Sequence, residues 1–131
     1  MAKQSGRTER ASRYGAKDGA VVGRGGERFF NRPLYSANTA AFALAGDRPA
    51  VQFAASDTVL GTLRWALRRG GRVRWLHANA EVVFAYRGGA ARWDVRDEAL
   101  GVRVTVEVVT LGERAGFAAR ARCRGGRAGD E

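Results

Sequence analysis

The chain has one cysteine, one histidine and two prolines among its 131 residues. A single cysteine excludes an internal disulfide framework and the paired spacing of a structural zinc site, and we expect Cys123 to be a small buried hydrophobic residue. His77 falls on the predicted core side of a strand, so we expect a structural histidine rather than a metal ligand or general base. No cofactor or metal is therefore expected.

Long apolar runs are also missing. The first thirty residues lack the apolar segment of about 7 to 15 residues that marks a signal peptide, and nowhere do about 18 apolar residues occur together, so no membrane span is expected. As written, the chain is expected in the cytoplasm by default, whereas a fragment cut from a longer exported protein would have the same features. Its length predicts one domain with one core, which argues against a two-domain enzyme.

Positive charge predominates, because 23 basic residues face 13 acidic ones and leave a net charge of +10. The excess is spread along the chain: residues 1–28 carry seven basic against three acidic residues, 29–117 twelve against eight, and 118–131 four against two. Arginine outnumbers lysine 21 to 2, as an arginine-rich proteome would produce without selection for a polyanion. Without a basic block, nucleic acid is not the expected partner.

What the chain does have is a series of short runs of alternating apolar and polar residues, separated by glycine-rich turn signals about 8 to 12 residues apart. No segment has the helical period of about 3.6 residues. The pattern predicts an all-β fold, an antiparallel β-sandwich of about 8 to 9 short strands. The predicted strands are 19–24, 41–45, 50–54, 62–67, 72–77, 81–87, 91–96, 102–111 and 117–123.

The predicted sandwich domain covers residues 19–124. Residues 1–18 are basic, polar and without period, and we expect a disordered, flexible arm there. Residues 125–131 are expected to form a flexible C-terminal tail. The turn signals Gly46-Asp47-Arg48-Pro49, Gly70-Gly71, Gly88-Gly89 and 112–116 are expected to supply positive φ angles for tight hairpins.

Alternation assigns the side chains of each strand to two faces. All three tryptophans fall on the apolar face, so a sugar-binding platform of exposed indoles is not expected. The predicted core face consists of Leu63, Trp65, Leu67, Val73, Trp75, His77, Val82, Phe84, Tyr86, Ala91, Trp93, Val95, Val102, Val104, Val106, Val108, Phe117, Ala119 and Ala121. The opposite face is predicted to be a solvated charged ladder of Arg64, Arg68, Arg72, Arg74, Arg87, Arg92, Asp94, Arg96, Arg103, Glu107, Arg120 and Arg122.

No catalytic set is evident. The segment 23–26 lacks the third glycine of a dinucleotide fingerprint, and no Gly-Lys-Ser/Thr follows to form a phosphate loop. Asp94, Asp97 and Glu98 are the closest carboxylate cluster, but Asp97 and Glu98 open a loop ended by Gly101, where polar residues turn the chain in water. We therefore expect no catalytic residue and no enzymatic activity in this chain.

The segment 26–35 is explained least by folding alone. It contains an Arg-Pro step, two adjacent aromatic residues and several hydrogen-bond donors, and loops are where ligand contacts usually occur. We take Asn31, Arg32, Tyr35 and Asn38 as candidates for an interdomain or ligand-binding loop. The alternative is that the segment anchors the fold.

The same segment carries a resemblance to a known family. The residues Arg28-Phe29-Phe30-Asn31-Arg32-Pro33-Leu34-Tyr35 match, with one extra phenylalanine, an Arg-Phe-Asn-Arg-x-Leu-Tyr stretch. Gly46 to Pro49 match a Gly-Asp-x-Pro turn, and Tyr86, Gly88 or Gly89, and Asp97 to Gly101 match a Tyr, Gly and Asp-x-x-x-Gly pattern. Over residues 13–126 the chain resembles the N-terminal β-domain of bacterial six-hairpin glycosidase-like proteins, a domain of unknown function.

This resemblance implies a β-sandwich that precedes an (α/α) barrel in a longer polypeptide, with the catalytic carboxylates downstream of Glu131. The expected continuation is missing, so we expect a fragment or truncated product, and no catalytic residue carries over. The function expected is a non-catalytic accessory domain of a carbohydrate-active protein that packs against this downstream helical domain. The alternatives are a basic β-barrel that binds nucleic acid and a direct carbohydrate-binding module.

Overall fold

The computed structural model describes residues 14–26, 29–38, 40–79 and 81–126, which form twelve β-strands and one short 3-10 helix, η1 (Leu76–Ala78). The strands are β1 (Tyr14–Lys17), β2 (Ala20–Arg24), β3 (Arg32–Leu34), β4 (Ala41–Ala45), β5 (Ala50–Ala55), β6 (Thr58–Arg64), β7 (Ala66–Arg69), β8 (Arg72–Trp75), β9 (Glu81–Arg87), β10 (Ala90–Asp97), β11 (Val102–Thr110) and β12 (Phe117–Arg124). The fold is all-β, as the alternation and the turn signals predict.

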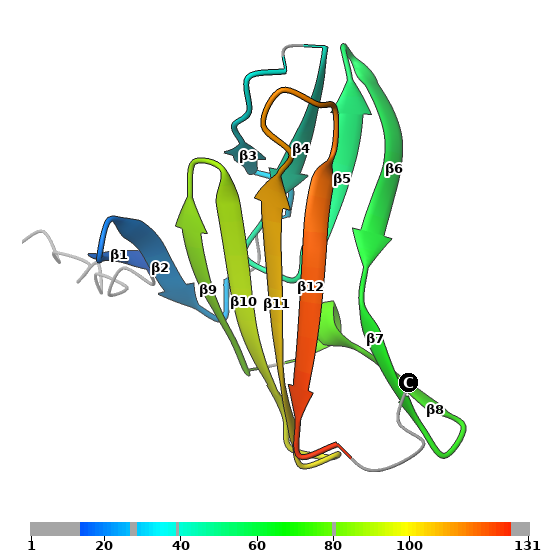
Figure 1. Ribbon diagram of the computed structural model, residues 1–131. Helices are drawn as coiled ribbons and strands as arrows, with labels where there is room; N and C mark the ends of the chain where they lie inside the picture. The colour runs from blue at the N-terminus through cyan, green and yellow to red at the C-terminus, as the bar shows by residue number, and fades with distance from the viewer. Residues whose placement is uncertain (1–13, 27–28, 39, 80, 127–131) are drawn as a thin grey trace, which may run out of the picture.

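The strand pairings in the described residues are all antiparallel. A six-stranded sheet has the order β1-β2-β9-β10-β11-β12, a four-stranded sheet the order β3-β4-β5-β6, and β7 and β8 form a two-stranded ribbon. Figure 1 shows the six-stranded sheet in front of the four-stranded sheet, with the ribbon continuing downward from β6. The described chain therefore has the two layers of a β-sandwich and one projecting ribbon.

Side chains from both main sheets form one hydrophobic core. Phe84 and Trp93 of the six-stranded sheet belong to the same buried cluster as Val51 of the four-stranded sheet. The Trp93 indole is fully buried, and its Nε1 donates a hydrogen bond to the carbonyl oxygen of Gly46 at 2.9 Å. Burying a large apolar side chain stabilises the fold by about 1.5 to 3 kcal/mol, so this shared cluster is what holds the two layers together.

The positions of most strands agree with the alternation. Ala41–Ala45 and Glu81–Arg87 have the predicted bounds, and most other strands differ by one or two residues at an end. Gly70 and Gly71 have φ angles of 53° and 75°, as expected for the β7–β8 turn. The expectation of positive φ is wrong at Gly46, Gly88 and Gly89. At Gly88 and Gly89 the missing Cβ instead leaves room for Tyr35.

Two strands and one strand break were not predicted. Tyr14–Lys17 pairs with β2, so the prediction of a disordered arm is wrong for these residues. The rest of the predicted arm that precedes them, 1–13, lies outside the described residues, and so do residues 127–131 of the predicted tail. Arg32–Leu34 forms an edge strand inside the predicted loop. The predicted strand 62–67 is divided at Trp65 between β6 and β7, which belong to different sheets. Each difference depends on a strand partner rather than on local pattern, which is why alternation missed it.

The predicted core face is correct for the central strands β9 to β11 and wrong toward the sheet edges. The predicted core residues that are exposed are Leu63, Val73, Trp75, Ala119 and Ala121. Because β6 and β12 are edge strands and β8 lies in the ribbon, fewer neighbours cover their apolar side chains. Cys123 on β12 is likewise exposed, which corrects its predicted burial.

Candidate functional site

The turn between β4 and β5, residues 46–49, brings together segments that are far apart in the chain. Asp47 is fully buried, and its carboxylate oxygens accept hydrogen bonds from Arg32 Nη2 and from Tyr14 Oη, both at 2.7 Å. Arg48 Nη1 donates a hydrogen bond to the carbonyl oxygen of His77 at 3.2 Å. The sequence marks this turn only as a break between strands, whereas in the fold it connects β1, β3 and η1.

The guanidinium group of Arg32 is enclosed by aromatic rings. Its Cζ lies 5.3, 4.7 and 5.6 Å from the ring centroids of Tyr14, Phe84 and Tyr86, distances at which cation–π attraction contributes. Burial raises the pKa of the Tyr86 hydroxyl, as does the neighbouring Tyr35, while Arg32 lowers it to a lesser extent. These contacts hold Arg32 within the fold. For this candidate residue they agree with the alternative that the segment anchors the fold.

Asn38 also makes its contacts within the chain. Its Oδ1 accepts hydrogen bonds from the backbone N–H groups of Ala40 and Ala41, both at 3.0 Å, which is an Asx-type turn leading into β4. Its Nδ2 donates to the carbonyl oxygen of Glu113 at 3.2 Å. Asn38 therefore ties the loop before β4 to the β11–β12 connection.

Tyr35 and Asn31 are the predicted candidates that stay exposed. The Tyr35 side chain is 67% exposed, while its backbone N–H donates to the carbonyl oxygen of Gly88 and its own carbonyl oxygen accepts from Thr110 Oγ1 at 3.0 Å. A Cβ on Gly88 would lie 3.2 Å from Tyr35 Cδ2, so the glycine allows the ring to lie against the β9–β10 turn. The fold thus presents Tyr35 on a rigid backbone, and Asn31 faces solvent separately.

An exposed aromatic cluster of Phe29, Trp75 and His77 was missed by the alternation. Ring centroids are 5.7 Å apart for Trp75 and His77 and 6.4 Å apart for Phe29 and His77. Trp75 is 49% exposed and Phe29 41% exposed. His77 is half-buried rather than a core residue, and burial, together with the nearby Arg64 and Arg48, lowers its pKa. In the sequence, Trp75 follows the Gly70-Gly71 turn by only a few residues. This short spacing was the available sign of a hairpin too small for other strands to cover its side chains.

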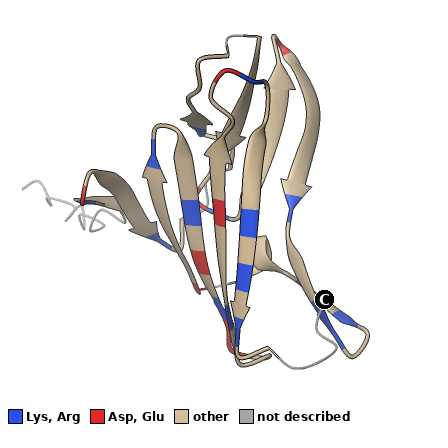
Figure 2. Cartoon of the chain, in the orientation of Figure 1, with Lys and Arg blue, Asp and Glu red and all other residues tan. Residues whose placement is uncertain are grey.

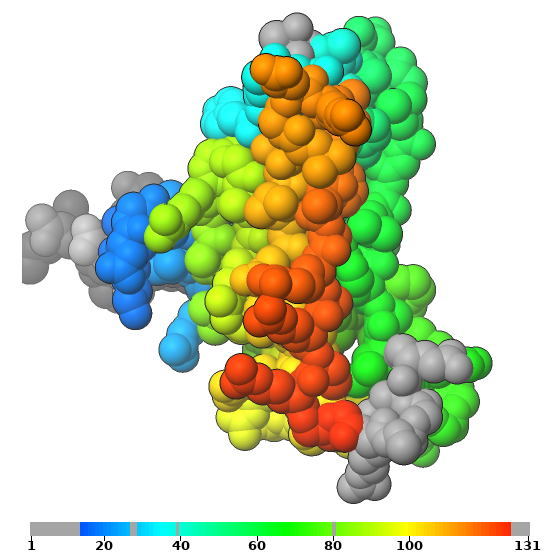
Figure 3. Space-filling view, in the orientation of Figure 1, coloured from blue at the N-terminus to red at the C-terminus, as the bar shows by residue number. Residues whose placement is uncertain are grey.

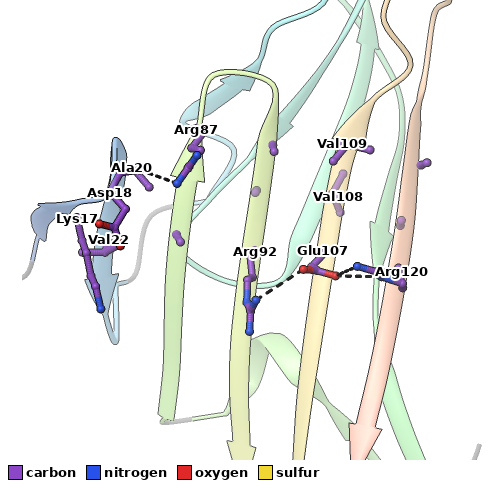
Figure 4. A pocket seen from close by; sticks show the side chains of 15 residues that line it. Lys17, Asp18, Ala20, Val22, Arg87, Arg92, Glu107, Val108, Val109 and Arg120 are labelled. Atoms are coloured by element: carbon purple, nitrogen blue, oxygen red, sulfur yellow. Dashed lines mark hydrogen bonds and ion pairs between the residues drawn. The ribbon is translucent and has the colours of Figure 1, made fainter.

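A groove of about 760 Å³ lies on the outer face of the six-stranded sheet, beside the β1–β2 hairpin (Figure 4). Its floor consists of small apolar side chains from neighbouring strands: Val22, Ala85, Ala90, Val109 and Ala118. Charged side chains surround this floor: Lys17, Asp18, Arg87, Arg92, Glu107 and Arg120. None of the described residues that line the groove is aromatic, so they offer no flat stacking surface of the kind that aromatic ligand sites use.

The acidic residues that are close in sequence point in different directions. Asp97 is buried and accepts hydrogen bonds from Arg74 Nε at 2.6 Å and from the Leu100 N–H at 3.0 Å. Burial alone would raise the pKa of Asp97, but these hydrogen bonds outweigh it and lower the pKa. Asp94 lies on the opposite face of β10 with Arg92 and Thr105. The two carboxylates thus serve separate structural contacts.

Comparison with protein-family models, with curated protein sequences and with solved structures finds no match for this chain. In the part of the chain that the structure describes, none of the helical segments is long and apolar enough to cross a membrane. Within the same residues, no three side chains of His, Cys, Asp or Glu are grouped so that they could hold a metal ion.

Proposed function

We propose that this chain is a non-catalytic β-sandwich accessory domain of a carbohydrate-active, glycoside hydrolase-like protein, and that it packs through its four-stranded sheet onto a downstream helical domain of the same polypeptide. The resemblance in residues 28–35, 46–49 and 86–101 supports the family part of the proposal. The observation that carries the packing part is the contrast between the two outer faces of the sandwich.

Among the described residues, the outer face of the four-stranded sheet carries one charged side chain, Arg64 at the end of β6. The register aligns Pro33, Leu44, Gln52 and Thr62 in one row across the four strands. The next row contains Phe42, Ala54 and Val59, of which Phe42 and Val59 are exposed. Figure 2 shows β4 and β5 without a charged residue along their length.

The outer face of the six-stranded sheet is charged at most comparable positions. It presents Arg24, Glu81, Arg87, Arg92, Asp94, Arg96, Arg103, Glu107, Arg120, Arg122 and Arg124. A contiguous face with little charge and exposed apolar side chains is a feature of interaction sites rather than of ordinary solvated surface. An interface with a second domain buries about 600 to 1,500 Å².

The proposal is tested in the complete polypeptide encoded by the genomic reading frame. Val59→Asp places a negative charge beside the exposed apolar residues of this face, and we expect it to lower the melting temperature of the complete protein by about 5 °C or more. In this chain alone, the same substitution should change the melting temperature little, because Val59 is 53% exposed. Val109→Asp is the matched control, since Val109 is 47% exposed on the charged face.

Two results would contradict this packing. One is a reading frame without a helical domain after Glu131. The other is a larger loss for Val109→Asp than for Val59→Asp. The non-catalytic part is tested by a panel of aryl glycosides and plant polysaccharides, on which this chain should show no turnover; activity that disappears when one of its own carboxylates is replaced would overturn it.

A second candidate function, direct carbohydrate binding, is favoured by the exposure of Trp75. Indole rings stack on the apolar faces of sugar rings, and Trp75 with His77 and Phe29 forms the exposed aromatic cluster described above. Calorimetric titration of neutral oligosaccharides into the wild-type chain and into Trp75→Ala distinguishes this candidate. Binding that is lost in Trp75→Ala while the melting temperature is retained would support it.

A further inference from the structure

Three arginines lie directly opposite one another on the outer face of the six-stranded sheet. Arg96 of β10 pairs in register with Arg103 of β11, and Arg103 pairs with Arg124 of β12. We refer to these three residues as the arginine row. They face away from the core, because the buried Val95 and Val104 alternate with them. Like charges directly opposite one another destabilise a sheet, so the arginine row works against the stability of the fold that contains it.

Neighbouring arginines on this face form ion pairs with described carboxylates, whereas two of the three members of the arginine row, Arg103 and Arg124, do not. Arg120 Nη2 lies 2.5 Å from Glu107 Oε2, and Arg92 Nη1 lies 3.7 Å from Glu107 Oε1 (Figure 4). The hydrogen bond from Arg120 lowers the pKa of Glu107, as expected for a paired carboxylate. By contrast, Arg103, Arg122 and Arg124 form no ion pair with any residue that the structure describes, and Arg96 pairs with the exposed Glu98 at 3.8 Å.

The surface around the arginine row is hollowed. A hollow of about 530 Å³ is lined by Arg96, Arg103 and Arg124, by Asp97, Glu98 and Val102, and by the glycines at 101 and 125. Of its two acidic residues, Asp97 is paired with Arg74 and Glu98 with Arg96. A second hollow, of about 140 Å³, is lined by Arg92, Arg103, Arg122 and Arg124, by Thr105, and by Asp94 and Glu107, which are ion-paired with Arg92 and Arg120. Figure 2 shows the basic positions of β12 following one another down the strand, and Figure 3 shows the same side of the molecule in space-filling form. Arg103 and Arg124 therefore border two adjacent recesses.

We propose that the arginine row binds an anionic polysaccharide, one that carries carboxylate or sulfate groups along its chain. Guanidinium groups present a planar fork of N–H donors that binds oxyanions through two parallel hydrogen bonds. Strands are about 4.8 Å apart, so the row spans about 10 Å and can contact successive anionic groups of one polymer. The saccharide part of this assignment rests on the proposed function. The anionic part rests on the register of the three arginines and on the absence of an ion pair from Arg103 or Arg124 to any described residue.

Nucleic acid fits this surface less well. Proteins that bind single strands combine positive charge with aromatic rings on which bases stack. The described residues on the outer face of β9 to β12 include no aromatic side chain, and the exposed rings of Tyr35 and Trp75 belong to other segments.

The test compares two double variants that remove the same charge from the same face. Arg103→Gln/Arg124→Gln removes two members of the arginine row, and Arg92→Gln/Arg120→Gln removes two ion-paired arginines. Isothermal titration calorimetry uses polygalacturonate as the carboxylated probe, heparin as the sulfated probe, dextran as the neutral polymer and oligo(dT) as the nucleic acid. Thermal melts come first, and the arginine-row variant should be at least as stable as wild type because it relieves like-charge contact.

We expect wild type to bind at least one of the two anionic polysaccharides and not dextran. The arginine-row variant should lose at least about tenfold in affinity, and the control variant less than about threefold. Binding of heparin alone identifies sulfate as the recognised group, and binding of polygalacturonate alone identifies carboxylate. Absence of polyanion binding, equal losses in the two variants, or tighter binding of oligo(dT) would overturn the proposal. None of these results bears on the outcome of the Val59→Asp melting experiment. The proposal of polysaccharide binding and the proposal of interdomain packing can therefore fail independently.

Discussion

The carboxylate of Asp47 and the guanidinium of Arg32 form an ion pair at 2.7 Å in which the carboxylate is fully buried. Asp47 belongs to the β4–β5 turn and Arg32 to the edge strand β3, so the pair connects two segments of the four-stranded sheet. Tyr14 from the six-stranded sheet occupies the second carboxylate oxygen. A turn residue thus becomes a connection between the layers of the sandwich.

Replacing Asp47 should therefore be costly. Asp47→Ala leaves the largely buried Arg32 without its ion-pair partner, and we expect a loss of about 3 to 5 kcal/mol in the free energy of unfolding. Urea denaturation measures this change. Asp57→Ala is the control, because Asp57 is an exposed aspartate in the β5–β6 turn and should change stability by less than about 0.5 kcal/mol. Equal effects of the two substitutions would show that the ion pair does not stabilise the fold.

Gly26 is packed against the same carboxylate. A Cβ at this position would lie 2.2 Å from Asp47 Oδ2, so Gly26→Ala must displace a buried, hydrogen-bonded group. We expect a loss of about 1 to 3 kcal/mol, comparable with overpacking of a core. Gly61→Ala on β6 is the control, because no atom lies within 4 Å of its added Cβ. Thermal melts that show Gly26→Ala to be as stable as Gly61→Ala would contradict the close packing.

The tryptophans should differ sharply in their importance for stability. Trp93 is fully buried, and Trp93→Ala should cost about 3 to 5 kcal/mol, enough to unfold a small domain. Trp75 is 49% exposed, and Trp75→Ala should cost less than about 1 kcal/mol. Circular dichroism melts of the two variants check this difference. If the Trp75→Ala variant unfolds, Trp75 is a core residue, as the alternation predicts.

His77 should make stability depend on pH near neutrality. Burial, Arg64 and Arg48 lower its pKa below 6.5, so the unfolded chain binds a proton more readily than the folded one. Stability is therefore complete above about pH 6.5, decreases as the pH falls below that value, and levels off below the pKa of the folded state. Melting temperatures between about pH 5 and 8 measure this slope. His77→Gln should flatten it, and an unchanged slope would assign the titration to another group.

Much of the fold follows from the sequence pattern. The alternation in 81–87, 91–96 and 102–111 predicts strands whose inward residues are buried, and Val82, Phe84 and Trp93 are buried as predicted. The reason is that side chains alternate by strand geometry alone, so a central strand with neighbours on both sides shows its pattern directly. Glycine pairs such as Gly70-Gly71 likewise reveal a turn through their own backbone freedom.

The candidate residues of the loop depended on context that no local pattern contains. Arg32 and Asn38 were selected for their hydrogen-bonding groups, but Asp47 and Glu113, which are their partners, lie 15 and 75 residues further along the chain. Tyr35 is exposed because the glycines of a distant hairpin support its backbone and ring. A polar side chain in a loop therefore indicates a contact without indicating whether a ligand or the chain itself provides it.

By itself the sequence determined the fold class, the positions of the central strands and the side of each on which the core lies, because these depend on the local two-residue period and on turn residues. Only the tertiary structure decided that Trp75 is exposed, that Asp47 is buried, and that Arg96, Arg103 and Arg124 stand opposite one another. These outcomes depend on which strand lies beside which and in what register. Such pairings join residues far apart in the chain, where no local pattern records them.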